Sequence, residues 1–161
     1  MIGHGSTCIV LIRTLFRELV CERFYLPETI PLPEIKSDVH PLDIEDAAII
    51  QASHAYCEYT DLNYVTTRIK DGHHAGLKVN GELVAWAITH DDGAIGFLYV
   101  KPEFRGSGLG KDLSAFNIKS LRSENLPVYV HIEKDNKASM TLVTNMGFVH
   151  DRTIRWFTMP V

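Results

Sequence analysis

The segment around residues 94–111 constrains the fold more than any other part of the chain. In it, glycine occupies every second position of a short stretch that lies between an apolar run and a helical pattern. The apolar run covers residues 94–100 (AIGFLYV), and Gly106, Gly108 and Gly110 follow it. Glycines in this position leave backbone N–H groups unpaired at the start of a helix, where the helix dipole favours an anion. Without Cβ atoms, a phosphate can approach the backbone closely. The segment therefore predicts a strand, an anion-binding turn and a helix in succession.

Three phosphate-binding patterns compete for this turn. A Walker A loop needs G-x-x-x-x-G-K-S/T, but Arg105 stands at its first glycine and Asp112 at its hydroxyl position. A dinucleotide-binding G-x-G-x-x-G turn needs a glycine where the chain has Lys111, and it follows the first strand of its fold. The pattern Q/R-x-x-G-x-G/A is satisfied by residues 105–110 (RGSGLG). A flexible glycine turn without a ligand is the alternative that the residues leave open.

Periodicity and turn residues give the order of the other elements. Apolar residues at helical spacing predict an amphipathic helix over residues 8–24, and the prolines of residues 26–33 (LPETIPLP) predict an extended connector. Asn80-Gly81 is a strong hairpin signal. We further expect strands at 34–40, 76–79, 82–89, 94–100 and 127–133, helices at 43–56, 63–70, 110–122 and 136–146, and one or two strands from residue 148 onwards. This order predicts an α/β (α+β) fold with a mixed sheet.

Composition excludes several classes of protein. A chain of 161 residues with 45% hydrophobic residues can bury the core of one domain. A net charge of -4 argues against a nucleic-acid binder, and no stretch approaches the roughly 18 apolar residues of a membrane-spanning helix. The three cysteines and the scattered histidines match no disulfide framework or metal motif. We therefore expect an intracellular, cytoplasmic protein (a mitochondrial one is the alternative) that binds no metal, nucleic acid or membrane.

With these elements in place, the chain resembles the GNAT superfamily of N-acetyltransferases from about residue 34 to its end. Residues 83–113 (LVAWAITHDDGAIGFLYVKPEFRGSGLGKDL) and 127–140 (PVYVHIEKDNKASM) resemble the glycine N-acyltransferase-like branch. The resemblance implies a GNAT-like mixed, mostly antiparallel central sheet, with helices on both faces and a splayed pair of central strands. It also implies an N-terminal helix and proline-rich connector over residues 1–33 and an acyltransferase domain over residues 34–161.

The same resemblance implies that acetyl-CoA or another acyl-CoA is the co-substrate. The backbone of Leu98, Tyr99 and Val100 would hydrogen-bond its pantetheine arm, and a backbone N–H there would stabilise the oxyanion that forms at the thioester. Asn136 would meet the cofactor where the two strands splay. The amides that would hold the pyrophosphate belong to Arg105, Gly106, Ser107, Gly108, Leu109, Gly110 and Lys111.

The proton carriers expected from the family are absent. Glycine N-acyltransferases use a glutamate at the position of Ala94, and many GNAT enzymes place a tyrosine at the position of Val143. Acyl transfer to an amine needs a base for the nitrogen and a proton for the leaving thiolate. The replacement candidates are His131, whose ordinary pKa suits base chemistry near neutral pH, Tyr99 as a donor to sulfur, and Glu133 on the same strand face as His131.

The sequence thus favours an acyl-CoA-dependent N-acyltransferase that acts on a small amine or an amino acid, with a homodimer as an open option for its assembly. The absence of the expected proton carriers at Ala94 and Val143 keeps a second hypothesis open, a catalytically weak CoA-binding module. A protein or peptide N-acetyltransferase is a third, since acidic residues such as Asp61, Asp91 and Asp92 could attract a basic substrate.

Overall fold

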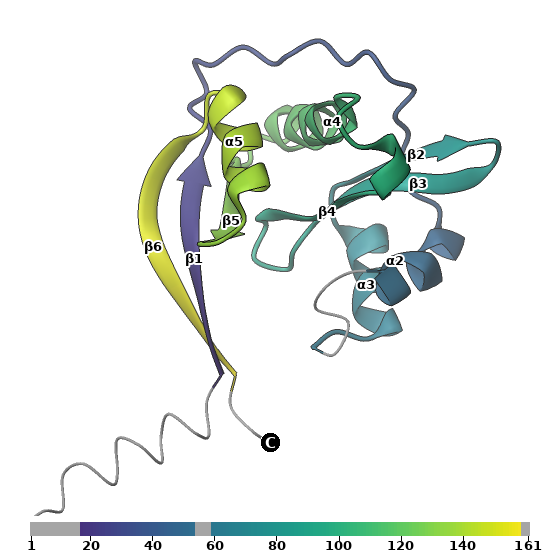
Figure 1. The fold of residues 1–161 in the computed structure, drawn as a ribbon, viewed down its shortest axis with the longest axis horizontal. Helices are drawn as coiled ribbons and strands as arrows, with labels where there is room; N and C mark the ends of the chain where they lie inside the picture. Colours follow the sequence, from purple (N-terminus) through teal and green to yellow (C-terminus); the bar gives the residue numbers. More distant parts are fainter. Residues whose placement is uncertain (1–16, 54–58, 159–161) are drawn as a thin grey trace, which may run out of the picture.

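A computed structural model describes residues 17–53 and 59–158. Its centre is a six-stranded sheet in the order β2-β3-β4-β5-β1-β6, with helices on both faces (Figure 1). This arrangement confirms the predicted mixed α/β fold. The elements are β1 (Arg17–Tyr25), η1 (Ile44–Asp46), α2 (Ala47–Ser53), α3 (Leu62–Asp71), β2 (His74–Val79), β3 (Glu82–Thr89), β4 (Ile95–Val100), η2 (Pro102–Phe104), α4 (Leu109–Ser123), β5 (Tyr129–Glu133), α5 (Lys137–Asn145) and β6 (Val149–Thr158).

The sheet consists of two antiparallel parts joined at its centre. Strands β2, β3 and β4 form an antiparallel meander, and β1 pairs antiparallel with both β5 and β6. The meander begins with the predicted hairpin, in which Asn80 and Gly81 have φ values of 52° and 81°, as a tight two-residue turn requires. The two parts meet where β4 runs parallel to β5. The predicted strands at 76–79, 82–89, 94–100 and 127–133 are confirmed within one or two residues at each end.

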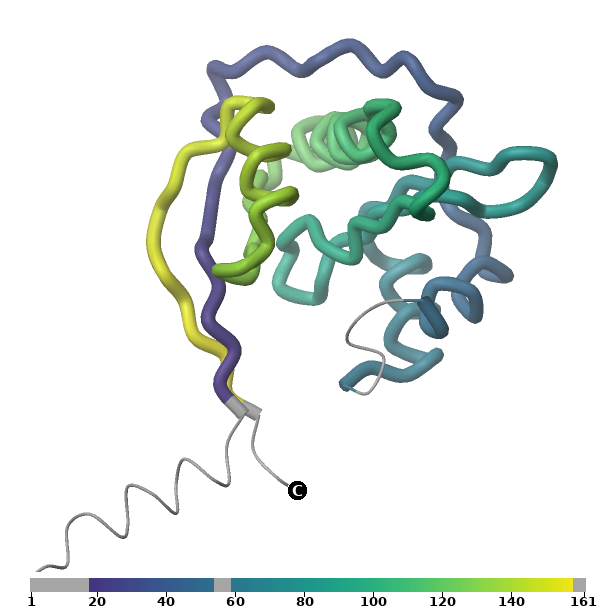
Figure 2. The backbone as a smooth tube through the Cα atoms, in the orientation of Figure 1, coloured from purple at the N-terminus to yellow at the C-terminus, as the bar shows by residue number. Residues whose placement is uncertain are grey.

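Helices cover the sheet in two layers (Figures 1 and 2). Helix α4 packs on β2, β3 and β4, and α2 and α3 cover the opposite face of the meander. A buried cluster that includes Ile50, Val65 and Trp86 joins α2 and α3 to β3. A second cluster, which includes Ile118, Val130 and Phe148, joins α4 to β5 and to the chain around α5. Helix α4 thus packs against both antiparallel parts of the sheet.

The connector between β1 and η1 (residues 26–43) begins with the predicted extended segment of residues 26–33 and crosses over α4 without regular structure (Figure 2). Two contacts tie it down. The guanidinium of Arg122 donates to the carbonyl oxygens of Pro27 and Ile30, each at 2.9 Å. The buried carboxylate of Asp112 accepts the backbone N–H groups of Lys36 and Ser37 at 3.2 and 2.8 Å.

The structure corrects two sequence predictions. The helix expected over residues 8–24 is wrong where it is described, because residues from Arg17 onwards form strand β1 (residues 8–16 lie outside the described part of the chain). Cys21 and Phe24 of this strand are buried, and pairing with β5 and β6 on both sides overrides the helical spacing of the apolar residues. The strand expected over residues 34–40 is also wrong, since only His40 forms a bridge, to Gly76.

The other helices follow their predicted signals. Asp43 is the N-cap of η1, which continues directly into α2, although the expected end of this helix at residues 54–56 lies outside the described ranges. Helix α3 begins after its cap Asp61 and ends at Gly72, as expected from its glycine. Within residues 17–53 and 59–158, no helix combines the length and apolar character needed to cross a membrane.

Candidate functional site

Strands β4 and β5 touch at one end and separate toward the other. Ile95 opposite Val130 is the one pair of residues that joins them in the described chain, whereas residues further along β4 pair with β3 alone. Two parallel strands that remain paired would fill this space with their hydrogen-bond ladder. The predicted splay of the central strands is therefore present, and it opens a gap in the middle of the sheet.

A bulge in β4 lies beside this gap. Trp86 pairs with Tyr99 and Ile88 with Gly96, so that two residues of β4, Phe97 and Leu98, face one residue of β3. Phe97 has a φ of 47°, a left-handed conformation that is uncommon outside glycine. Bulges of this kind change the direction in which backbone groups point and are frequent next to active sites.

The glycine turn follows β4 at its far end. Gly106 and Gly108 have φ values of 78° and 87°, and a Cβ added at either would meet no atom within 4 Å. Gly108 caps α4 without a side-chain hydrogen bond. In the described chain, the backbone N–H groups of residues 106–110 donate to no backbone oxygen. The turn therefore offers unpaired donors, open space and a helix N-terminus in one place.

Side chains of the same turn fix its shape. The guanidinium of Arg105 donates to the carbonyl oxygen of Val100 at 2.9 Å and lies 5.9 Å from the centre of the Tyr99 ring. The hydroxyl of Ser107 donates to the carbonyl oxygen of Phe104 at 2.5 Å. Both contacts engage backbone carbonyl oxygens, so neither occupies an amide group of the turn.

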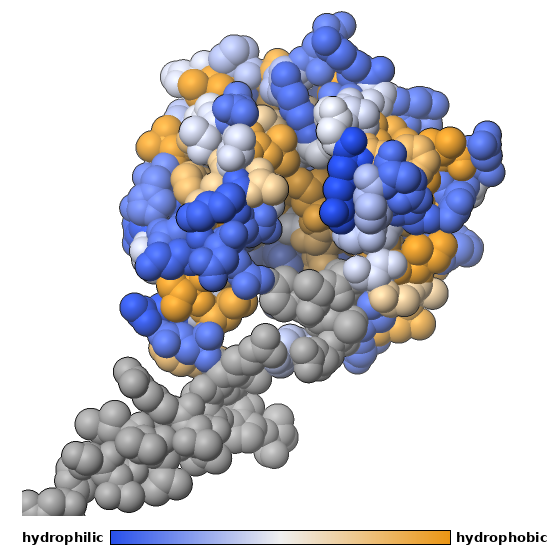
Figure 3. All heavy atoms as spheres, viewed as in Figure 1, coloured by the Kyte–Doolittle hydropathy of each residue, from blue (hydrophilic) through white to orange (hydrophobic). Residues whose placement is uncertain are grey.

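A cavity of about 470 Å³ occupies the splay. Figure 3 shows apolar residues in the hollow at the centre of this face. Five predicted site residues line the cavity, whereas Val100 and residues 105–111 do not and lie beyond its rim. The five are Leu98, Tyr99, His131, Glu133 and Asn136.

The predicted base His131 lies largely buried beside a carboxylate. Its side chain is 13% exposed, and its Nδ1 lies 3.4 Å from a carboxylate oxygen of Asp92. Burial lowers the pKa of His131 below its ordinary value of 6.5; the carboxylate of Asp92 acts in the opposite direction, and the charge of Arg23 lowers the pKa further. The imidazole is consequently neutral at pH 7, as a base must be before it accepts a proton.

Tyr99 and Glu133 occupy different walls of the cavity. The Tyr99 ring stacks on the buried indole of Trp86, with centroids 4.6 Å apart and planes inclined by 24°. Glu133 pairs with Cys21 of β1 in the sheet. Burial raises the pKa of the Cys21 thiol to about 11, with further contributions from Glu133 and Glu22. Cys21 is therefore a protonated wall residue of the cavity at neutral pH.

Asn136 has a structural contact at the end of the splay. Its side-chain oxygen accepts the backbone N–H of Ser139 at 3.1 Å, so it caps α5 as the sequence predicts. Ala94 and Val143 are buried, and Val143 lines the cavity. Apolar side chains thus stand at both positions where the resemblance implies proton carriers.

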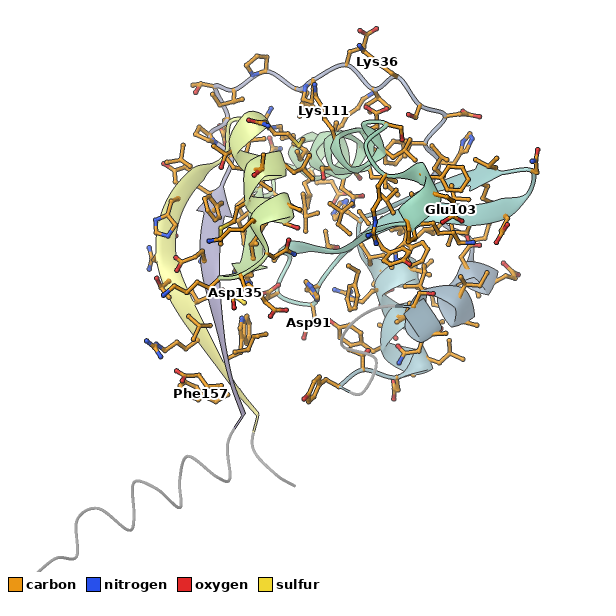
Figure 4. All side chains as sticks on the ribbon, in the orientation of Figure 1. Lys36, Asp91, Glu103, Lys111, Asp135 and Phe157 are labelled. Atoms are coloured by element: carbon orange, nitrogen blue, oxygen red, sulfur yellow. The ribbon has the colours of Figure 1, made fainter. Side chains whose placement is uncertain are left out.

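Sequence reasoning named Asp92 only as a possible attractor of a basic substrate, and it missed both the contact of Asp92 with His131 and the cavity residue His90. Asp92 and His90 belong to the tight turn between β3 and β4, where Figure 4 labels their neighbour Asp91. Residues 91–93 (DDG) are a turn signal, and nothing local shows that the turn reaches across to β5. Among the residues that the structure describes, no three His, Cys, Asp or Glu side chains are arranged to hold a metal ion.

Comparison with known proteins identifies relatives of this chain. The family model described as FR47-like protein matches residues 75–157. A mycothiol acetyltransferase from Streptomyces scabiei is 32% identical over 174 aligned residues, covering 91% of this chain and 56% of that protein. A mycothiol acetyltransferase from Nocardiopsis dassonvillei is 35% identical over 91 residues, which are 48% of this chain and 28% of that protein. The chain thus spans between about a quarter and about half of the length of these two relatives.

Solved structures share the fold over most of the chain. A Drosophila protein superimposes with a TM-score of 0.82 and 23% identity, over 99% of this chain and 59% of that one. An acetyltransferase of the GNAT family from Colwellia psychrerythraea superimposes with a TM-score of 0.67 and 17% identity, over 96% of this chain and 62% of that one. At these identities the likeness concerns the fold.

Proposed function

The chain belongs to the FR47-like family within the GNAT superfamily of acetyltransferases, and we propose that it transfers an acetyl or other acyl group from acyl-CoA to the amine of a small molecule or amino acid. The observation that carries this proposal is the splay of β4 and β5. It opens a cavity beside the bulge of β4, and the anion-binding turn follows at the end of the same strand. Acyl-CoA matches this arrangement, because it carries a thioester at one end of a long arm and a diphosphate at the other.

The residues present fit acyl-CoA. Tyr99 and Val100 pair with β3 on one side, and no pairing with β5 occupies their other side, where an extended arm can lie as a further strand. The unpaired N–H groups of residues 106–110 and the open space at Gly106 and Gly108 fit the pyrophosphate. Asn136 stands at the opposite wall of the splay. Acyl-CoA supplies the activated carbonyl carbon.

Two cavity residues complete the proton balance. The nitrogen–carbon bond of the amide forms as the carbon–sulfur bond breaks, so the nitrogen loses a proton and the sulfur gains one. In our proposal His131 accepts the proton from nitrogen, because burial favours its neutral form and its ring lines the cavity. Tyr99, on the β4 wall, donates to sulfur. Glu133 is the third candidate, as a carboxylate close to the amine.

The test is turnover by the purified chain. A panel of acyl-CoA thioesters and amines, with detection of the free thiol, should show thiol release that depends on the amine. No release across a broad panel would contradict the proposed function. Monoamines, diamines and amino acids in the panel would identify the acceptor class.

The role of His131 is tested by His131→Gln, which removes the base and retains a polar side chain. We expect kcat to fall by roughly 100- to 10,000-fold, the usual contribution of general acid–base catalysis, while the dissociation constant of CoA stays unchanged. His150→Gln is a matched control, because His150 of the edge strand β6 contacts Glu22 of β1 and does not line the cavity. A kcat in His131→Gln equal to that of the control would exclude His131 as the base.

One observation favours a second function, a CoA-binding module with little catalysis. The positions expected to carry protons hold the buried residues Ala94 and Val143. Such a module would be stabilised by CoA without releasing thiol from acyl-CoA. The specific resemblance to the glycine N-acyltransferase-like branch remains a prediction, which acceptor specificity for glycine in the same panel would support.

A further inference from the structure

We propose that Asp92 of the β3–β4 turn is a positioning residue for His131 of β5. The two side chains form an acid–imidazole pair that takes the place of the carboxylate base missing at Ala94. This inference rests on the proposed function, since it assigns His131 the role of base. Asp92 belongs to the turn between β3 and β4, and several hydrogen bonds fix the position of this turn.

The contact between the two side chains defines the geometry. Nδ1 of His131 lies 3.4 Å from Oδ2 of Asp92, and the Asp92 side chain is about one-third exposed. A carboxylate at Nδ1 favours the tautomer that carries its proton there, which leaves Nε2 as the basic nitrogen. It also stabilises the imidazolium that forms when Nε2 takes a proton. The aromatic rings of Tyr129 and Trp156, at 5.6 and 5.7 Å, confine the imidazole between them.

The second oxygen of Asp92 is already engaged. Oδ1 accepts the backbone N–H of Ala94 at 3.0 Å, and the Tyr129 hydroxyl donates to the backbone carbonyl of Asp92. These bonds tie the turn to itself and to β5. The two hydrogen bonds fix Asp92 while its Oδ2 lies toward His131. The carboxylate therefore does not need to reorganise when the imidazole becomes charged.

Helix α3 holds the same turn from its other side. The Tyr64 hydroxyl donates to the carboxylate of Asp91 at 3.0 Å, and the Arg68 guanidinium donates to the carbonyl oxygen of His90 at 3.0 Å. The turn is therefore fixed between α3 and β5. Its position relative to His131 is a property of the fold and does not depend on one flexible side chain.

The charges around His131 explain why a carboxylate is needed there. The titratable and charged groups around it from the neighbouring strands are Arg23 and Cys21 of β1, Tyr129 and Glu133 of β5, and Asp151 of β6. A carboxylate oxygen of Asp151 lies 3.5 Å from Nε of Arg23. The turn contributes Asp91, Asp92 and His90. Burial and Arg23 both oppose the imidazolium, and Asp92 is the group that favours it. Without Asp92, His131 would be a weaker base in the same place.

The experiment compares Asp92→Asn with Asp91→Asn in the otherwise complete chain. Asparagine retains an oxygen for the Ala94 N–H and removes the charge, and Asp91→Asn removes one charge from the same turn without touching His131. The imidazole of His131 is titrated by NMR, with His131→Gln assigning its signal. We expect the pKa of His131 to fall in Asp92→Asn and to change much less in Asp91→Asn. An unchanged pKa in Asp92→Asn would overturn the pair.

Activity provides the second measurement. At saturating substrates, the acid limb of kcat should move to lower pH in Asp92→Asn, and kcat should fall by roughly ten- to a hundredfold, a part of what a general base contributes. Asp92→Glu, which restores the charge, should regain part of kcat. A lowered imidazole pKa with an unmoved kcat profile would overturn the positioning role. Absence of turnover by the wild-type chain would instead overturn the proposed function, and the NMR titration would still report on the contact itself.

Discussion

The carboxylate of Asp112 accepts a hydrogen bond from the backbone N–H of Ser37 at 2.8 Å, which joins the first turn of α4 to the connector. The same oxygen accepts the N–H of Lys36 at 3.2 Å, and Asp112 is 6% exposed. In the sequence, Asp112 stands where a Walker A loop would carry its magnesium-binding hydroxyl. In the structure it holds the connector over the helix whose N-terminus forms the glycine turn.

We predict that Asp112→Ala lowers the free energy of unfolding by about 1–3 kcal/mol, because two partly buried backbone donors lose their acceptor. Asp112→Asn retains an acceptor oxygen and should lose less. The measurement is urea denaturation at pH 7. Asp135→Ala is the control for loss of a carboxylate, since Asp135 is exposed. Equal stabilities of Asp112→Ala and the control would show that the connector contact contributes nothing.

The glycine turn allows a matched pair of variants. Gly108 and Gly81 both have φ near +85° (87° and 81°), and neither would place a Cβ within 4 Å of another atom. Alanine at either position should therefore carry a similar strain of about 1–2 kcal/mol. Only Gly108→Ala places a methyl group in the turn that we assign to the pyrophosphate.

We expect CoA to raise the melting temperature of the wild-type chain and of Gly81→Ala, and to leave Gly108→Ala unchanged at the same concentration. Thermal denaturation with and without CoA measures this directly. If CoA stabilised Gly108→Ala as much as Gly81→Ala, the pyrophosphate would have to bind elsewhere.

These elements show how far the sequence determines the fold. The hairpin at Asn80-Gly81 and the cap of α5 at Asn136 depend on a few adjacent residues, and both are confirmed where they were predicted. The helix expected from residue 110 begins one residue earlier, at Leu109. Strand β1 depends on partners at the other end of the chain, such as Glu133 and Ile154 opposite Cys21. Its short apolar pattern fits a helix as well as a strand, and the long-range pairing decides between them.

The candidate site divides in the same way. The backbone chemistry of residues 105–110 is local, so a motif predicts it. The contact of Asp92 with His131 arises because the β3–β4 turn meets β5 beside the pair of Ile95 and Val130, and no spacing along the sequence encodes that meeting. Tyr99 was a candidate for its hydroxyl, and its stacking on Trp86 became visible only with the register of β3 and β4.

Cys21 gives a prediction on reactivity. Its pKa, raised to about 11 from an ordinary value of 9.0 by burial and by the carboxylates of Glu133 and Glu22, keeps the thiol protonated. In a variant with Cys8 and Cys57 replaced by serine, Cys21 should react slowly with a disulfide reagent at pH 8 and rapidly in urea. Rapid reaction in the folded state would contradict its burial.

The same shift has a consequence for stability at high pH. Because the unfolded thiol ionises first, its contribution to the free energy of unfolding is complete below about pH 9 and declines as the pH rises toward about 11. Cys21→Ser in the same background should show a smaller decline over this range. Identical pH dependence in the two proteins would exclude the thiol as its source.

Tyr99 can be tested as the proton donor because its ring and its hydroxyl have separable roles. Tyr99→Phe retains the stack on Trp86, whereas Tyr99→Leu loses it, at a cost of about 0.5–1.5 kcal/mol in the free energy of unfolding. If the hydroxyl protonates the leaving sulfur, Tyr99→Phe should lower kcat with acetyl-CoA while leaving stability and CoA binding unchanged. An acyl donor whose thiol has a lower pKa leaves without a proton, so the variant and the wild-type chain should use it equally well. Equal loss with both donors would point to a displaced cofactor, and no loss with acetyl-CoA would exclude Tyr99 as the donor.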